Sequence, residues 1–344
     1  MTTAERAELP LLLAGRARQT RAPALAAALV GVDGLIDAAV VGATVRGGGD
    51  PAAPDDLWHI GSCGKSMTGA LYARLVEAGE AEWGAPLTAL LPDLSGIDRG
   101  WSAVTIDQVL ACVAGLPANL TRAELAAGWR DERPLTEQRT EIAGATMSAP
   151  PAAPGRFVYS NLGYIVAGAV IERLTGRPFE EALVTHVLRP LGITTAGFGA
   201  PPRLVGHAPR VLLGSLAVGR GRPVPASEPQ ADNPAIMGPA GRVHLSVADW
   251  AAFHTMVLRR GGDFLTPESL RRLMTTPAGS RMGMGWADAR GVPATHGMQG
   301  SNTMWAATAL VDIERSRTAF VLANDGRTRM LNDTARLAAR MLAR

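Results

Sequence analysis

Lysine is almost absent from the sequence. Of the 34 lysine and arginine residues among 344, only Lys65 is a lysine, so arginine carries nearly every positive charge. Arginine stays protonated in any protein environment, whereas a desolvated lysine can lose its proton and act as a base. Either one surface lysine has survived by chance, or position 65 needs a base that arginine cannot provide.

Other scarcities narrow the class of protein. The two cysteines, Cys63 and Cys112, are too few for a disulfide framework, and we expect free thiols in a reducing compartment. No run approaches the ~20 uninterrupted apolar residues of a membrane-spanning helix. The 34 basic residues barely exceed the 31 acidic ones and are scattered along the chain, so nucleic-acid binding is not indicated.

The N-terminal region lacks the pattern of a secretory signal. It mixes both signs of charge around a run of three leucines. A second apolar run, residues 22–32, follows three arginines and is the alternative candidate for a signal peptide. We expect a cytoplasmic protein that does not insert into a membrane.

Hydrophobic periodicity gives a coarse map of the first part of the chain. Strand patterns occur at residues 38–45 and 57–60, which we expect to form an early strand pair. From Ser62 onward, apolar residues recur every four positions until a glycine, which predicts a helix. Short helical pieces follow, then a buried helix over 162–176 and a long loop over 199–234.

Regular patterns return in the C-terminal part. A helix is predicted over 247–260, followed by two β-rich runs, 303–313 and 318–325, that form an antiparallel hairpin. A final amphipathic helix is predicted over 329–344. These elements complete a chain with strands near both ends and helices in the middle.

This order of elements predicts an α/β (α+β) fold. One sheet is assembled from residues 1–80 and 235–344, and residues 81–234 form a mainly helical inserted domain. With 47% apolar residues, the chain can fill a core of that size. We expect the active site to lie between the two domains.

The residues around Lys65 match one catalytic pattern and fail two others. Gly-Lys-Ser at 64–66 ends like a phosphate-binding loop, but that motif needs glycine where His59 stands. A nucleophile elbow needs glycine where Ile60 stands. The pattern that fits is Ser-x-x-Lys, formed by Ser62 and Lys65.

The spacing of this pair suits nucleophilic catalysis. Residues three apart at the start of a helix lie on one face, so Lys65 can reach the Ser62 hydroxyl. A serine hydroxyl is a poor nucleophile until a base removes its proton. The positive end of the helix favours the alkoxide and lowers the lysine pKa. We therefore predict that Ser62 is a nucleophile and Lys65 its base.

Two further motifs supply groups for such a site. Tyr159 and Asn161 are two apart and point to one side of an extended segment, where Tyr159 relays a proton and Asn161 contacts substrate. The alternative for Tyr159 is an ordinary core tyrosine. Around His296 and Gly300, an edge strand can offer a backbone N–H that, with the N–H of Ser62, forms an oxyanion hole. A lone histidine such as His296 more often has a structural role.

The order of these motifs resembles the serine β-lactamase and penicillin-binding-protein superfamily, and more narrowly the class C β-lactamase-related hydrolases and esterases. The resemblance covers most of the chain and is carried by HIGSCGKSMTGALYARLVEAGE, GLPANL, FVYSNLGYIVAGAVIERLTG, GPAGRVHLSVADWAAF and GSNTMW. It implies an antiparallel sheet built from both chain ends, flanked by helices, with a mainly helical domain inserted.

The resemblance also implies roles for particular residues. Ser62 is the acylated nucleophile, Lys65 and Tyr159 share the work of the base, and Asn161 contacts the substrate. The backbone N–H groups of Ser62 and Ser301 form the oxyanion hole. No cofactor or metal is implied.

The third motif departs from the pattern of the relatives. They often read His-x-Gly-Ser-Asn, and this chain has two more residues between His296 and Ser-Asn. Either the strand bulges and His296 faces the site, or it runs straight and Met298 takes that place. We favour the bulge, because Gly297 permits the backbone angles that it needs. Near Cys112 a histidine of the relatives is also replaced, which we interpret as a packing change.

We therefore expect a serine hydrolase that forms an acyl-enzyme on a small-molecule ester, amide or lactam. An intracellular acyltransferase of specialised metabolism, using the same acyl-enzyme, is one alternative. A catalytically silent binding protein on the same scaffold is another. The sequence does not predict an oligomeric state.

Overall fold

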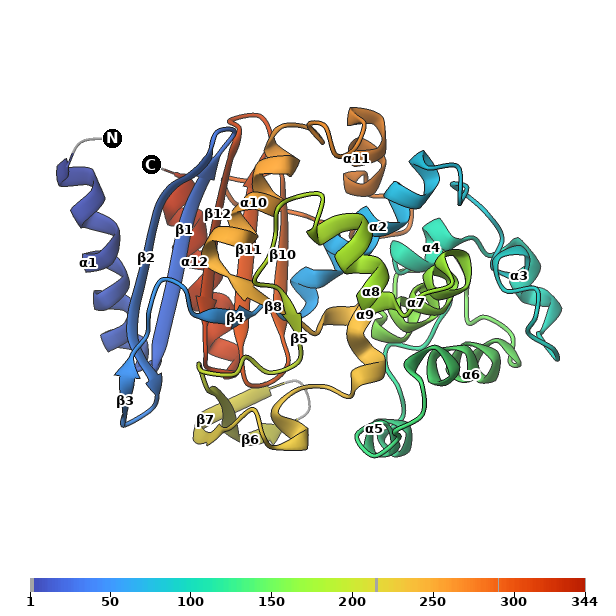
Figure 1. Ribbon diagram of the computed structural model, residues 1–344, viewed down its shortest axis with the longest axis horizontal. Coiled ribbons are helices and arrows are strands. Elements are labelled where there is room, and N and C mark those ends of the chain that lie inside the picture. The colour runs from blue at the N-terminus through green and yellow to red at the C-terminus, as the bar shows by residue number, and fades with distance from the viewer. Residues whose placement is uncertain (1–2, 214–215, 290, 344) are drawn as a thin grey trace.

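One sheet runs through the part of the molecule that holds both chain termini (Figure 1). The computed structural model describes residues 3–213, 216–289 and 291–343. All six strand pairs of this seven-stranded sheet are antiparallel. Its strands lie in the order β3 (Gly48–Pro51), β2 (Gly34–Val45), β1 (Ala24–Gly31), β12 (Arg317–Ala323), β11 (Ala306–Asp312), β10 (His296–Ser301) and β9 (Ala287–Asp288). The predicted sheet from both chain ends is confirmed.

The apolar run at residues 22–32 forms β1, which lies between β2 and β12 near the middle of the sheet. Its side chains alternate between two buried clusters: Ala24 and Ala26 face one, and Leu25 and Ala27 face the other. Helices cover both faces, so both sets of side chains are apolar. That is why this strand has no polar alternation in the sequence.

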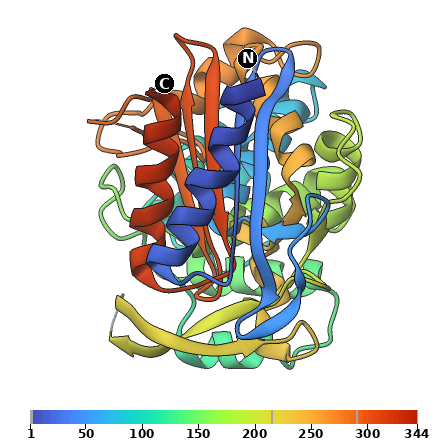
Figure 2. The same ribbon diagram turned by 90° about the vertical axis from the view of Figure 1, so that its left-hand side faces the viewer.

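Two helices from opposite ends of the chain cover one face of the sheet. They are α1 (Thr3–Thr20) and α12 (Thr328–Leu342), which lie side by side in Figure 2. An ion pair between Arg16 and Asp333 joins them. On the other face, α10 (Val247–Leu258) packs against β1 and β2. The predicted helix over 247–260, the C-terminal hairpin and the final helix are confirmed.

A smaller sheet corrects one expected strand pair. Strand β4 (Leu57–His59) pairs with β8 (Val243–Ser246), and β8 also pairs with β5 (Gly197–Phe198). The expected partner of β4, residues 38–45, is part of β2, whose open edge is taken by β3. The prediction of an early strand pair was therefore wrong. After β2 the chain turns back and forms β3 along the edge of β2 before β4 begins.

The expected long loop over 199–234 is also wrong. Strands β6 (Gly206–Leu213) and β7 (Leu216–Val224) form a hairpin there. A register shift after His207, together with Pro209, obscures the alternation that marks strands in a sequence. The hairpin is tied to the main sheet, since the His207 ring contacts the carbonyl of Asn324 at 2.7 Å. The domain boundaries at 80 and 235 stay a prediction.

Helices make up most of the middle of the chain and lie together on the right of Figure 1. The predicted buried helix is α7 (Asn161–Thr175), which ends at Gly176 with φ +63°. The other α-helices in the described ranges are α2 (Lys65–Glu77), α3 (Leu87–Leu90), α4 (Ile106–Leu110), α5 (Arg122–Gly128), α6 (Leu135–Met147), α8 (Phe179–Leu183), α9 (Gly238–Gly241) and α11 (Pro267–Met274). Short helical turns are η1 (Gly61–Gly64), η2 (Arg99–Ala103), η3 (Val184–Leu188), η4 (Pro229–Ala231) and η5 (Ala235–Met237).

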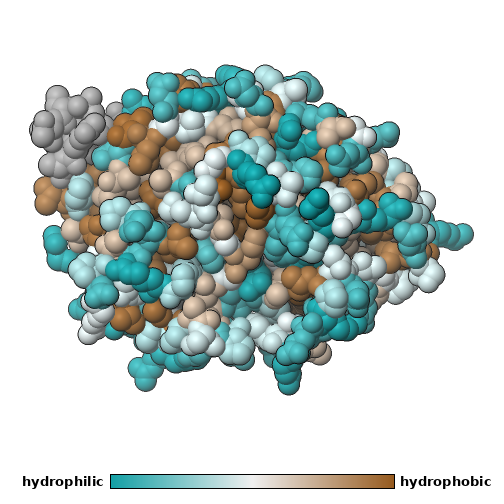
Figure 3. Space-filling model, in the orientation of Figure 1, coloured by the Kyte–Doolittle hydropathy of each residue, from teal (hydrophilic) through white to brown (hydrophobic). Residues whose placement is uncertain are grey.

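Polar and apolar side chains are interspersed over the face of the molecule shown in Figure 3. Within the part of the chain that the structure describes, no helix is both long and apolar enough to cross a membrane. Cys63 and Cys112 are both buried and unpaired, so the expectation of free thiols is confirmed.

Candidate active site

The candidate nucleophile lies in a tight turn between the small sheet and a buried helix. Ser62 is in η1, directly after β4, and Lys65 is the first residue of α2. Gly61 takes φ +52°, and a side chain there would collide with the backbone of Gly300 and Ser301. Two glycines thus let the turn and β10 touch backbone to backbone.

Lys65 is fully buried and holds three oxygen atoms. Its Nζ lies 3.0 Å from Ser62 Oγ and 2.7 Å from Asn161 Oδ1, and it also donates to the carbonyl of Ala240 in α9. None of these groups is a carboxylate. The rings of Tyr159 and Tyr164 enclose the amine, each with its centroid 5.1 Å from Nζ.

This environment changes the chemistry of the amine. Burial lowers the pKa of Lys65 from 10.5 to about 7. The charged form loses its hydration and gains no counter-ion in exchange. A substantial fraction of Lys65 is therefore neutral near pH 7 and can accept a proton from Ser62, as the sequence pattern predicts.

Tyr159 contacts the same serine from the other side. Its hydroxyl hydrogen-bonds with Ser62, while 38% of the residue's surface remains exposed. Burial of the hydroxyl end raises the pKa of Tyr159 above its usual value of 10, and the hydrogen bond with Ser62 offsets this only in part. Tyr159 is therefore a neutral phenol that can pass on a proton rather than a phenolate base.

Asn161 is the first residue of α7, and its side chain links two parts of the site. Its Oδ1 accepts from Lys65, so its Nδ2 points the other way and donates to Asn119 Oδ1 at 2.6 Å. Ser160 caps the helix by accepting from the N–H of Gly163. The cap fixes the orientation of the helix start, and with it that of Asn161.

Strand β10 lies against the nucleophile turn through its last two residues. Gly300 packs on the carbonyl of Ile60 and the backbone nitrogen of Ser62, and Ser301 packs on Gly61. This approach puts the N–H groups of Ser62 and Ser301 on facing segments, as an oxyanion hole requires.

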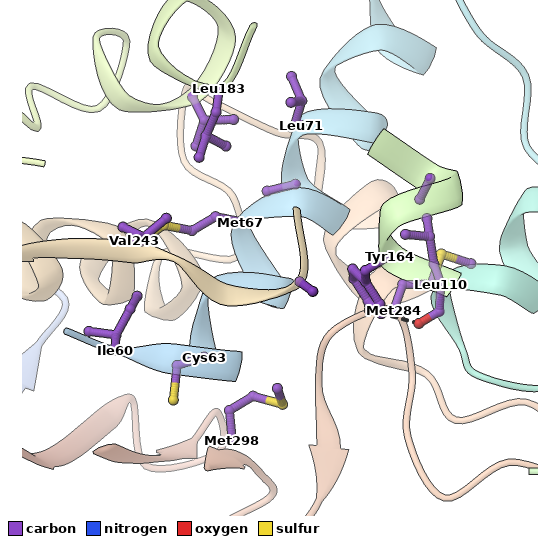
Figure 4. Packing of buried hydrophobic residues seen from close by; sticks show 14 of the residues in the cluster. Ile60, Cys63, Met67, Leu71, Leu110, Tyr164, Leu183, Val243, Met284 and Met298 are labelled. Atoms are coloured by element: carbon purple, nitrogen blue, oxygen red, sulfur yellow. Dashed lines mark hydrogen bonds between the residues drawn. The ribbon is translucent and has the colours of Figure 1, made fainter. Parts of the chain in front are cut away.

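The expected bulge in β10 is wrong. Its pairing with β11 runs without a shift from His296 opposite Val311 to Ser301 opposite Ala306. Met298 is buried close to the turn that carries Cys63 (Figure 4). The strand stays straight because each residue from His296 to Ser301 has its own partner on β11, which leaves no extra residue to bulge out.

His296 lies apart from the other candidate residues. It pairs with Asp288 of β9 and lines a cavity with Met274 and Thr295, away from Ser62. Burial lowers the pKa of His296, which leaves it neutral at pH 7. The structure does not bring His296 together with Lys65 and Tyr159, and its substrate-binding role stays an untested prediction.

A second cavity includes one of the candidate residues, Tyr159, in its lining. It has a volume of about 510 Å³ and is also lined by Phe157, Arg281, Met298 and neighbouring residues of β10 and β11. Pockets of this size suit a small-molecule substrate. Among the described residues, no cluster of three or more His, Cys, Asp or Glu side chains is suited to hold a metal ion.

Sequence reasoning missed two groups that shape the site. The carbonyl of Ala240 holds Lys65, but a backbone carbonyl leaves no mark in residue type. Asn119 holds Asn161 and lies in GLPANL, a segment that carried the resemblance without being given a role. A chemical reading of that segment would have singled out Asn119 as its one polar side chain.

A family model described as Beta-lactamase matches residues 11–342. The chain belongs to the beta-lactamase family. The family assignment agrees with the order of motifs and with the antiparallel sheet built from both chain ends. It confirms the resemblance to the serine β-lactamase and penicillin-binding-protein superfamily.

Relatives within this family carry several names. The chain is 30% identical to unguisins hydrolase ungD' of Aspergillus campestris (strain IBT 28561), over 62% of this chain and 40% of the relative. It is 29% identical to penicillin-binding protein 4 of Amycolatopsis lactamdurans, over 74% of this chain and 63% of the relative. It is 32% identical to esterase EstB of Burkholderia gladioli, over 44% of this chain and 41% of the relative. The matches thus span less than two thirds of each of these relatives, and their names support a serine hydrolase.

Solved structures show the same fold at low identity. An octameric penicillin-binding protein homologue from Pyrococcus abyssi superposes with a TM-score of 0.74 at 22% identity, over 98% of this chain and 77% of that one. SurE superposes with a TM-score of 0.77 at 22% identity, over 99% of this chain and 76% of that one. At this identity the likeness shows the fold alone.

Proposed function

We propose that the protein is a serine hydrolase that acylates Ser62 with the acyl part of an ester, amide or lactam. The observation that carries the proposal is the contact of 3.0 Å between Ser62 Oγ and the buried Nζ of Lys65. Burial lowers the pKa of Lys65 to about 7, which suits a general base. The hydrolase and esterase names of the relatives support the same reaction class.

The proposed reaction begins with proton transfer. Neutral Lys65 takes the hydroxyl proton of Ser62 as Oγ attacks the carbonyl carbon of the substrate. The carbonyl oxygen becomes an oxyanion and accepts from the N–H groups of Ser62 and Ser301, each worth roughly 3 to 4 kcal/mol in the transition state. The bond to the leaving group then breaks, Tyr159 gives its hydroxyl proton to the departing oxygen or nitrogen, and the proton held by Lys65 passes to Tyr159, so both groups regain their starting forms.

Water completes the cycle in this proposal. A water molecule attacks the acyl carbon, its proton passes back through Lys65 or Tyr159, and Ser62 Oγ leaves as the hydroxyl. The cavity lined by Tyr159 and Met298 is the proposed place for part of the substrate, because Tyr159 hydrogen-bonds with Ser62. Asn161 is within the same cluster through its bond to Lys65 and is proposed to contact the substrate.

Intact-mass spectrometry tests the proposal directly. Incubation with a fluorophosphonate or with p-nitrophenyl acetate should add one adduct, and peptide mapping should place it on Ser62. Ser62→Ala should abolish the adduct. Ser66→Ala is the matched control, because this serine lies one turn along α2 and hydrogen-bonds to the carbonyl of Cys63 instead of Lys65. An adduct elsewhere on active protein would refute the assignment.

The same assay separates the alternatives. An acyltransferase would form the adduct on Ser62 but release it faster to an added amine or alcohol than to water. A silent binding protein would form no adduct with either reagent. We also propose that the protein acts in the cytoplasm, a location supported by its free thiols at Cys63 and Cys112. Fractionation of cells from the source organism checks that location.

A further inference from the structure

A buried carboxylate lies behind the nucleophile turn. Asp232 follows η4, is 4% exposed and accepts four hydrogen bonds. Its Oδ2 contacts His59 Nε2 at 3.0 Å and Arg242 Nε at 3.2 Å. Its Oδ1 accepts from Asn302 Nδ2 and from the N–H of Asn233, both at 2.8 Å. Burial raises the pKa of Asp232, but His59, Arg242 and Asn302 outweigh it and hold the pKa below the usual value.

The histidine connects this carboxylate to the nucleophile. His59 is the last residue of β4, and its Nδ1 accepts the N–H of Gly61 at 3.1 Å. A ring nitrogen that accepts carries no hydrogen, so the hydrogen of the neutral ring is on Nε2 and faces Asp232. Asp232 thus fixes the ring, and the ring holds the N–H of Gly61, the residue immediately before Ser62.

The asparagine connects the same carboxylate to the other proposed oxyanion donor. Asn302 follows Ser301 at the end of β10, and its Oδ1 accepts the N–H of Met304 at 3.1 Å. Both ends of the amide are therefore held, and the peptide that follows Ser301 cannot rotate freely. Arg242, the third side-chain partner, directly follows α9, whose Ala240 holds Lys65. Three segments of the site meet at one carboxylate.

We propose that Asp232 is a positioning residue for catalysis, acting through His59 and Asn302 to hold the N–H groups of Ser62 and Ser301 at the spacing of an oxyanion hole. The proposal rests on the proposed function, since it needs Ser62 to be the nucleophile. Oxyanion stabilisation depends on donors that are already in place when the charge develops, and small displacements reduce the rate. Nothing in the sequence pattern marks Asp232, because His59 and Asn302 are far from it along the chain.

The test uses variants that each break one link. Asp232→Asn keeps the size and removes the charge. His59→Asn keeps an acceptor near the position of Nδ1 and loses the donor to Asp232, whereas His59→Gln keeps a donor near Nε2 and loses the acceptor for Gly61. Asp249→Asn is the control, because this carboxylate accepts three hydrogen bonds from Thr194 and Thr195 and contacts no segment of the site.

Each variant is assayed on one activated ester, with fluorophosphonate labelling of Ser62 and circular dichroism at the assay temperature. We expect Asp232→Asn and both His59 variants to lower kcat about 10- to 1,000-fold with KM within about twofold, and to slow labelling by a similar factor. In the double variant of Asp232→Asn with His59→Asn, the second change should add little, because the link is already broken. A purely structural junction would lower stability and leave kcat unchanged.

The outcomes separate this proposal from the one on which it rests. If Ser62 of the wild type is not labelled, the proposed function is wrong and the positioning role falls with it. If wild-type Ser62 is labelled and folded Asp232→Asn matches Asp249→Asn in kcat, the positioning role alone is overturned. Should Asp232→Asn fail to fold, the two His59 variants decide in the same way.

Discussion

Two fully buried basic side chains, Arg139 and Lys65, donate to backbone carbonyls at the two ends of the segment 235–240. Their other partners differ in charge. Arg139 of α6 donates to the carbonyls of Ala235 and Ile236, and it forms ion pairs with Glu172 and Glu180. Lys65 donates to the carbonyl of Ala240, at the other end of that segment, and has no carboxylate among its hydrogen-bond partners in the described chain.

The comparison explains why the chain keeps a single lysine. A buried guanidinium with two carboxylates stays charged and joins α6, α7 and α8 to the segment before α9. A buried ammonium without a carboxylate loses affinity for its proton. The first arrangement is that of a structural junction and the second suits the base that we propose, so we expect that the residue types are not interchangeable at the two positions.

The largest effect is expected where the base is replaced by a permanent cation. Lys65→Arg keeps a positive charge but cannot accept the proton of Ser62, so acylation should fall about 10²- to 10⁴-fold while the fold is retained. Stopped-flow or burst kinetics with p-nitrophenyl acetate measures the rate. Arg74→Lys, farther along the same helix, should leave it unchanged. Near-normal acylation by folded Lys65→Arg would remove the contrast between the two cations.

The next effect concerns stability at the other cation. Arg139→Met leaves the buried Glu172 and the half-buried Glu180 without their partner, and the free energy of unfolding should fall by about 3 to 5 kcal/mol. Urea unfolding followed by circular dichroism measures it. The control is Arg133→Met, whose ion pair with Asp131 is exposed to solvent and should matter little. Equal stability of the two variants would contradict a structural junction at Arg139.

The third effect is a pH dependence. Lys65 acts only when it is neutral, and burial lowers its pKa to about 7. The acylation rate should therefore fall about tenfold for each pH unit below 7 and reach a plateau above it. The pH profile of kcat/KM for a neutral ester shows the inflection. Tyr159 does not interfere, since its pKa is raised above 10. An inflection near 10 would mean that Lys65 keeps its ordinary proton affinity.

The smallest effect comes from a third buried base that has no catalytic partner. The ring of His254 packs among Trp250, Phe253, Trp286 and Phe320, and within the described ranges neither of its nitrogens has a hydrogen-bond partner. Burial lowers its pKa from 6.5 to about 3. Between these values the unfolded chain binds a proton that the folded protein does not, so stability is lost as pH falls below 6.5.

Replacement by phenylalanine isolates this contribution. From pH 6.5 to pH 5, the stability of His254→Phe relative to wild type should rise by roughly 1 kcal/mol for each pH unit. Urea unfolding of both proteins at pH 7.5, 6 and 5 gives the difference. A difference that stays constant with pH would show that the unfolded and folded states bind the same number of protons at this position.

Much of the fold was predictable because its signals are local. The period of four after Ser62, the hairpin of β11 and β12 and the amphipathic C-terminal helix all come from neighbouring residues. The strand β1 and the hairpin of β6 and β7 were not recognised. Strand β1 pairs with β12 from the other end of the sequence, the hairpin has a register shift near Pro209, and neither alternates apolar with polar residues.

The residues of the site also divide into those that a local sequence pattern reveals and those that it does not. Ser62 and Lys65 are one helical turn apart, and Tyr159 and Asn161 are two residues apart, so each pair is visible as a pattern. The carbonyl of Ala240 and the carboxylate of Asp232 contribute through contacts between distant segments. The straight course of β10 follows from its residue-by-residue pairing with β11, which no spacing rule contains.

The pairing of β1 with β12 has a consequence for biosynthesis. Leu25 lies opposite Ala323, so β1 waits until about 300 further residues have been made before its neighbour β12 leaves the ribosome. Contacts of such long sequence separation slow folding, and an apolar strand without its neighbour is prone to aggregate. Alanine fills much of β1, so the unpaired segment exposes less apolar surface than a strand of valine or isoleucine would.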